Sequence, residues 1–116
     1  MSYENEEKME QIDITFDDGR QIKISGKLLA EINNKWSEGI EGPIELTFWR
    51  EYHLYKTSQG KFVIVYASHR ESIYEKEKFK VFSSESEVIE YAKKKDERII
   101  YILLKKANLP IIIEIE

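Results

Sequence analysis

The sequence contains no cysteine. This absence excludes disulfides, thiolate zinc sites, iron–sulfur clusters and a cysteine nucleophile. A chain of this size without such cross-links relies on its hydrophobic core for stability. A reducing compartment is the natural setting for it.

Long apolar runs are also missing, because no stretch approaches the roughly 18 uninterrupted apolar residues of a membrane-spanning helix. The first ten residues, MSYENEEKME, are acidic and polar, whereas a signal peptide has a positive start and an apolar run. We therefore expect a cytoplasmic protein with no membrane partner. Residues 1–10 are expected to be a flexible acidic lead-in, and residues 11–116 a single domain.

The chain has no excess of positive charge, since 18 Lys and Arg against 22 Asp and Glu give a net charge of −4. Nucleic-acid binding depends on cations that neutralise phosphates, so it would require a local patch. The one basic concentration in the sequence is a candidate anion contact, formed by Lys93, Lys94, Lys95, Lys105 and Lys106. A lysine run is most often a solvated helix end that suits the helix dipole.

Apolar and polar residues alternate before and after a turn near the N-terminus. Ile12, Ile14 and Phe16 have the period of two that is typical of a half-buried strand, and Ile22 and Ile24 resume it. The intervening sequence DDGR supplies turn residues. These features predict a hairpin.

The next segment, SGKLLAEINNKW, is ambiguous in its periodicity. Leu28, Leu29, Ile32 and Trp36 suit one face of a helix, whereas the even-numbered residues from 24 to 32 continue the alternation of a strand. The following run WSEGIEGP, residues 36–43, contains two glycines and a proline and is expected to be a loop between two hairpins.

A second hairpin is predicted around the turn TSQG, with Gly60 in a left-handed conformation. Counting back from the turn pairs Tyr55 with Val63, Tyr52 with Tyr66 and Trp49 with His69. Strand 61–68 is apolar on both faces, which predicts a central strand that is covered on both sides. This argues against an open base-stacking surface, although GKFVIVY superficially resembles an RNA-recognition strand.

The C-terminal part is predicted to contain one more strand, EKFKVFS, and then two helices. Ser84 and Glu87 have the spacing of a capping box at the start of the first helix, and Asp96 is expected to cap the second. The tail IIIEIE alternates and predicts a closing strand. The expected fold class is therefore α+β: an antiparallel sheet of hairpins with two C-terminal helices packed on it and a closing C-terminal strand.

Several segments resemble the uncharacterised bacterial EXLDI family, which is named after a C-terminal motif. The matching segments are DGRQIKISGKLLAE, YHLYKTSQGKFVIVY, FKVFSSESEVIEY and LLKKANLPIIIEIE. The chain departs from the naming motif, with Ile111 in place of Glu and Glu114 in place of Asp. The resemblance implies no activity and no catalytic residues, but it favours a strand over residues 22–32, which we adopt.

Many members of that family also carry an N-terminal segment that resembles a ribbon-helix-helix DNA-binding unit. This sequence begins too late to include it, which weakens an expectation of DNA binding.

The only two histidines, His53 and His69, are expected on one face of the second hairpin. They lie about four residues apart, or ~13 Å, which is too far to share a zinc ion with ligands at ~2 Å. The neighbouring Glu51 and Glu71 are expected to point to the other face, so neither histidine has an evident acid–base partner. SGKLL lacks the remaining residues of a phosphate-binding loop, and G-x-S-x-G and G-x-G-x-x-G do not occur.

We therefore expect no catalytic residues, no metal site and no cofactor. The expected function is non-enzymatic binding of an unknown protein or small molecule, and nucleic acid is not an expected partner. The candidate binding surface consists of Trp36, Trp49, Tyr52, His53, Tyr66 and His69. Two alternatives remain open: a nucleic-acid-associated regulatory protein that uses the C-terminal lysines, and a small enzyme without a recognisable motif.

A homodimer is also expected. A final apolar strand is either paired within the chain or exposed as an edge, and an exposed edge pairs readily with a second copy.

Overall fold

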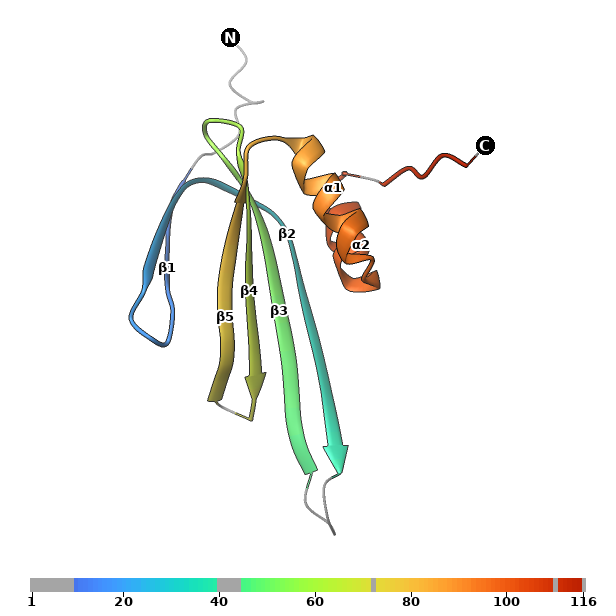
Figure 1. Cartoon of the computed structure of the whole chain (residues 1–116). Coiled ribbons are helices and arrows are strands. Elements are labelled where there is room, and N and C mark those ends of the chain that lie inside the picture. The colour runs from blue at the N-terminus through green and yellow to red at the C-terminus, as the bar shows by residue number, and fades with distance from the viewer. Residues whose placement is uncertain (1–9, 40–44, 72, 110, 116) are drawn as a thin grey trace.

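The computed structural model describes residues 10–39, 45–71, 73–109 and 111–115. It confirms the α+β class, with five strands followed by two helices (Figure 1). The elements are β1 (Glu10–Thr15), β2 (Gln21–Gly39), β3 (Glu45–Thr57), β4 (Phe62–Arg70), β5 (Ile73–Phe82), α1 (Glu85–Lys95) and α2 (Arg98–Lys106).

The strands form one antiparallel sheet in the order β1-β2-β3-β4-β5. The predicted register of the second hairpin is confirmed, including the pairs Tyr52–Tyr66 and Trp49–His69. Gly60 has a φ of 83°, and the Thr57 amide donates to the Lys61 carbonyl at 2.8 Å, as the predicted three-residue turn requires. Because β2 also pairs with β3, the two predicted hairpins belong to one continuous meander.

Residues 22–32 form a strand, as the family resemblance suggested, but the alternation of β2 is interrupted. Leu28 pairs with Tyr55 and Ala30 pairs with Leu54, so Leu29 is an extra residue at a β-bulge. The bulge reverses which face the even-numbered residues occupy. As a result, Ile24 and Ala30 belong to separate hydrophobic clusters on opposite sides of the sheet.

The loop expected over residues 36–43 is partly wrong, because the strand β2 continues through Gly39. Residues Trp36–Gly39 pair with the beginning of β3, so ladder hydrogen bonds override the local turn preference of glycine. The remaining residues of that segment lie outside the described ranges.

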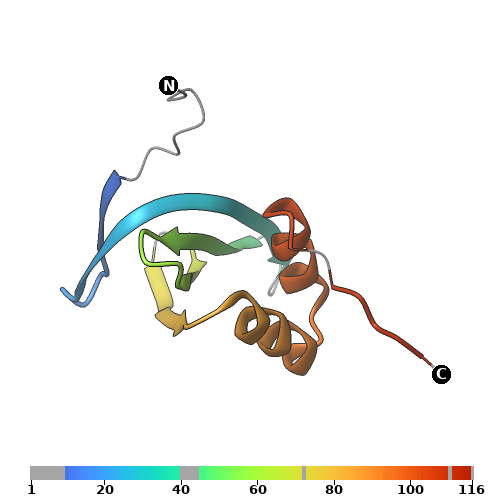
Figure 2. The same cartoon turned by 90° about the horizontal axis from the view of Figure 1, so that it is seen from above.

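The sheet is strongly curled (Figure 2). It has a separate core on each side. The outer core lies between the sheet and the helices and includes Leu54, Ile64 and Leu104. The inner core lies on the concave face, where the β1–β2 hairpin folds over Val63 and Val65. The prediction that β4 is buried on both faces is therefore confirmed.

Helix α1 begins at the predicted cap. The Glu87 amide donates to Ser84 Oγ at 3.3 Å, while the Glu87 carboxylate accepts from the Ser83 amide at 3.2 Å. The prediction for Asp96 is wrong, because this residue ends α1 with a φ of 49° and Glu97 precedes α2. The Asp96 carboxylate instead accepts a hydrogen bond from the Tyr101 hydroxyl at 2.8 Å.

The predicted closing strand is also wrong for the described part of the tail. Residues 111–115 form no strand, and Ile113 and Ile115 are 63% and 90% exposed. The sheet edges are β1 and β5, whereas the tail leaves α2 and runs away from the sheet (Figure 1). The alternating isoleucines of the tail have the pattern of a strand, but a strand also needs a neighbouring sheet edge to pair with, and the tail does not lie along one.

Neither described helix is long and apolar enough to cross a membrane.

Candidate functional site: a basic cleft between the sheet and the helices

The predicted binding surface is divided between the two faces of the sheet. Tyr52 and Tyr66 lie on the face that carries the helices, where they join the outer core. Trp49, His53 and His69 occupy alternate positions on the opposite, concave face. Trp36 pairs with Phe48 near the far end of β2, and its side chain is outside the described part of the structure.

On the helix face, a cleft of 430 Å³ lies between the sheet and the helices. We call it the basic cleft. Its cationic side chains are Arg50, Lys78, Lys80 and Lys95, and its single carboxylate is Glu97. Three tyrosines also line it: Tyr52, Tyr66 and Tyr91. The cleft is therefore rich in positive charge and in hydroxyl donors.

The position of the helices explains why this part of the sheet is polar. Phe82 of β5 lies beneath α1 and is only 3% exposed, with its ring 5.0 Å from that of Tyr91. The next residues on the same face are Lys80 and Lys78, which pair with Ile64 and Tyr66 of β4. The helices lie over one end of the strands (Figure 1). Lys78 and Lys80 are exposed.

The ammonium groups lie over the tyrosine rings. Lys78 Nζ is 5.2 Å from the Tyr66 ring centre, and Lys80 Nζ and Lys95 Nζ are 5.0 and 5.8 Å from that of Tyr91. Tyr66 also packs on Tyr52 at 4.7 Å. Such contacts hold cations in place while their N–H groups stay available to an anion. They also occupy ring surface that base stacking would need.

Burial favours the protonated hydroxyl of two of these tyrosines, Tyr52 and Tyr91. It raises the pKa of Tyr52 to about 12, helped by the nearby Tyr66 and the Glu97 carboxylate and opposed by Arg50. The pKa of Tyr91 is raised by burial and by Glu97. Both phenols therefore retain an O–H donor at neutral pH.

The five lysines of the predicted anion contact do not form one patch. Lys95 lines the basic cleft, whereas Lys93 and Lys94 line a second space of 620 Å³ beside α1, which we call the α1 hollow. Lys105 and Lys106 lie in the last turn of α2.

The concave face holds a partly buried hydrogen-bonded pair, His69 and Glu51, which corrects the prediction for Glu51. His69 is 5% exposed, its Nε2 lies 2.5 Å from Glu51 Oε2, and Trp49 stacks on its ring at 4.5 Å. Glu51 is opposite Ala67, so it shares the face of His69 and is its diagonal neighbour. Counting residues two apart along β3 could have found this pair.

Glu71, the other predicted neighbour, lies in the turn after β4 and has a φ of 56°. Its carboxylate accepts a hydrogen bond from the Thr47 amide at 3.0 Å. It therefore serves to hold the ends of β3 and β4 together.

Next to the His69–Glu51 pair, a pocket of 260 Å³ on the concave face is lined by Asp13, Glu51, His53 and Glu77, among others. We call it the acidic pocket. Among the described residues, no three histidine or carboxylate side chains are arranged to hold a metal ion. As predicted, His53 and His69 lie four residues apart along the register.

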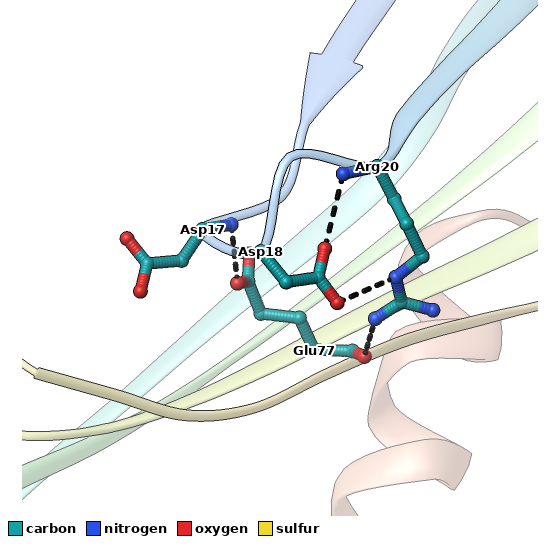
Figure 3. A network of polar contacts seen from close by, with 4 residues as sticks. All are labelled: Asp17, Asp18, Arg20 and Glu77. Atoms are coloured by element: carbon teal, nitrogen blue, oxygen red, sulfur yellow. Dashed lines mark hydrogen bonds and ion pairs between the residues drawn. The ribbon is translucent and has the colours of Figure 1, made fainter.

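The β1–β2 hairpin closes over this face by contacts with β5 (Figure 3). Glu77 Oε1 accepts from the Asp17 amide at 2.6 Å, and Arg20 Nη2 donates to the Glu77 carbonyl at 2.9 Å. Arg20 is in turn paired with Asp18 at 2.8 Å. These contacts form a latch that joins the hairpin tip to the far edge of the sheet.

No family model, no curated protein and no solved structure matches this chain. The resemblance to the EXLDI family therefore stays a prediction from the sequence segments that carry it.

Proposed function

We propose that the chain is a non-enzymatic binding module that holds an anionic ligand in the basic cleft. The observation that carries this proposal is the local reversal of charge. A protein with a net charge of −4 gathers four cations and one carboxylate around a single cleft.

The chemistry of the lining favours an oxyanion such as phosphate. Lysine and arginine form short, charge-assisted hydrogen bonds with such groups, and neutral phenols add further donors. The cleft volume of 430 Å³ is within the range of roughly 300–1,000 Å³ for small-molecule sites. The end of α1 and the start of α2 meet beside the cleft, so their opposite dipoles offset each other and the side chains dominate.

A binding role also fits the placement of the acid–base groups. The one buried histidine, His69, is paired with Glu51 on the opposite face of the sheet. The cleft is lined instead by lysine, arginine and tyrosine side chains, with Glu97 as its carboxylate. They suit recognition of charge better than proton transfer.

Isothermal titration calorimetry with tripolyphosphate tests the proposal. The double variant Lys78→Gln/Lys95→Gln removes two cations from the cleft and should weaken binding roughly tenfold, at up to about 1 kcal/mol for each exposed charge. Lys105→Gln/Lys106→Gln makes the same change in net charge on α2, outside the cleft, and should keep the affinity of the unmodified chain.

Absence of saturable binding in the unmodified chain would contradict the proposal. Equal losses in the two double variants would also contradict it, because they would show a general charge effect.

Homodimerisation stays a prediction, which sedimentation at micromolar concentration tests.

A further inference from the structure

The basic cleft and the α1 hollow share a boundary. Lys80 of β5 and Tyr91 of α1 line both spaces. The Lys80 ammonium lies 5.0 Å from the centre of the Tyr91 ring, so the shared boundary is itself a cationic contact. The two spaces therefore adjoin along β5 and α1.

Positive charge continues along this path. Arg50, Lys78 and Lys95 lie on the cleft side, Lys80 stands at the boundary, and Lys93 and Lys94 lie on the side of the α1 hollow. Six cations thus face the path, against three carboxylates.

The three carboxylates differ in their hydrogen bonding and position. Glu87 accepts a hydrogen bond from the Ser83 amide, which holds its side chain at the start of α1. Glu90 is exposed, and Glu97 precedes α2 on the cleft side. Cations outnumber carboxylates in both spaces, by four to one in the basic cleft and by three to two in the α1 hollow when Lys80 is counted in each.

We infer that the basic cleft and the α1 hollow together bind an extended chain of phosphate groups, with a short anion occupying the cleft alone. This inference rests on the proposed function, and it names the ligand class. Recognition would be by charge, because the tyrosine rings contact lysines and one another instead of stacking on bases. Binding of a nucleic acid here would therefore not depend on its base sequence.

Two sources share this chemistry: inorganic polyphosphate and single-stranded nucleic acid. The net charge of the chain predicts weak binding to nucleic acid, whereas the charges along the path favour it. Separate titrations with long-chain polyphosphate and with labelled oligo(dT) distinguish the two.

The experiment compares each long chain with tripolyphosphate in three proteins: the unmodified chain, Lys93→Gln/Lys94→Gln and the control Lys105→Gln/Lys106→Gln. At least one long chain should bind the unmodified chain about tenfold more tightly than tripolyphosphate. The α1-hollow variant should lose most of this gain and keep its affinity for tripolyphosphate. In this variant, the slope of log affinity against log salt concentration should become shallower by about 1.4. This is roughly 0.7 for each phosphate that a lysine no longer neutralises.

Helix integrity is checked by circular dichroism, since Lys93 and Lys94 lie in the last turn of α1 and suit its dipole. Lys93→Arg/Lys94→Arg keeps both charges and should retain the gain with chain length. If the glutamine variant unfolds, loss of part of that gain in Lys93→Gln or Lys94→Gln alone supplies the same test.

The outcomes separate the two levels of the proposal. Binding of polyphosphate, oligo(dT) or both with the expected dependence on Lys93 and Lys94 supports the inference and identifies the source. Tripolyphosphate binding without any gain from chain length, or equal effects of the α1-hollow variant and the control, overturns the inference and leaves the proposed function standing. Failure of all three anions to bind overturns both.

Discussion

The two faces of strands β3–β5 are built from alternate residues of the same segments, yet they are closed in different ways. The concave face is covered by the chain's own β1–β2 hairpin, and it contains the partly buried pair of Glu51 and His69. The outer face is covered by α1 and α2 over part of its length, which leaves the basic cleft beside them. On the outer face, the charged residues Lys78 and Lys80 lie beside the helices and line the cleft.

Strand β5 makes the difference in charge between the faces explicit. Glu77 faces the acidic pocket and the hairpin latch, whereas its neighbour Lys78 faces the basic cleft. Because successive side chains in a strand point to opposite faces, an alternating Glu-Lys sequence separates the two signs of charge. A net charge for the whole chain hides this separation.

The largest expected effect on stability comes from truncating a buried side chain on either face of β4. Ile64→Ala on the outer face should lower the free energy of unfolding by about 2 to 5 kcal/mol, because it leaves a cavity in the core. Val65→Ala on the concave face should cost about 1.5 to 3 kcal/mol, since it removes two buried carbons. Urea unfolding measures both values. A loss under half a kcal/mol at either position would mean that this face is not packed.

Gly26 is the next most sensitive position, because it joins the part of β2 that pairs with β1 to the part that pairs with β3. A Cβ at this residue would overlap the Lys56 carbonyl oxygen, which is backbone and cannot move without breaking the sheet. Gly26→Ala should therefore cost about 3 kcal/mol in thermal or urea unfolding.

Gly60→Ala is the comparison for Gly26, since a Cβ there meets open space and only the positive φ is strained. It should cost roughly 1 to 2 kcal/mol. A smaller loss for Gly26→Ala than for Gly60→Ala would contradict the close approach of β2 and β3.

Alkaline pH should weaken the outer face through Tyr52. Its pKa is raised from 10.0 to about 12, so the unfolded chain loses this proton first and stability falls as pH rises between those values. We expect Tyr52→Phe to reduce the loss by roughly 1 to 2 kcal/mol, less than the full shift because the residue lines an open cleft. Unfolding curves across that range measure it, and an unchanged pH dependence in Tyr52→Phe would refute the assignment.

The smallest expected effect follows from removal of the hairpin latch. Glu77→Ala removes the acceptor of the Asp17 amide and should cost about 1 kcal/mol, with faster hydrogen exchange at that amide. Glu75→Ala is the matched control, because its carboxylate meets Arg70 only at 3.9 Å on the surface and should contribute close to nothing. Equal exchange rates at Asp17 in the two variants would mean that the Glu77 carboxylate does not hold the hairpin tip.

Much of the sheet was predictable because its signals are local. The turn at Gly60 fixes the register that sets Tyr52 against Tyr66, and the burial of Val63, Ile64, Val65, Leu103 and Leu104 follows from strand and helix patterns. The bulge at Leu29 was not predictable in this way. It depends on how β2 pairs with two different neighbours, which no local pattern encodes.

The candidate site was predictable only in fragments. Tyr52, Tyr66 and Lys95 were among the predicted residues, whereas Arg50, Lys78, Lys80, Tyr91 and Glu97 were missed. The pairing of Tyr66 with Lys78 depends on the register of β4 and β5, which contains a second irregularity after Ser68. The approach of α1 depends on tertiary packing. Charge alternation in EKEKFK was the available signal, and it required knowledge of which face the helices leave open.

An NMR titration with tripolyphosphate that follows assigned aromatic side-chain signals tests directly whether the outer face binds anions and the concave face does not. The ring signals of Tyr66 and Tyr91 should shift in a saturable manner, since both rings line the cleft beside its lysines. Those of His53 and His69 should stay in place, because both residues lie on the concave face. Saturable shifts of the histidine signals with unchanged tyrosine signals would mean that the anion binds the concave face and not the basic cleft.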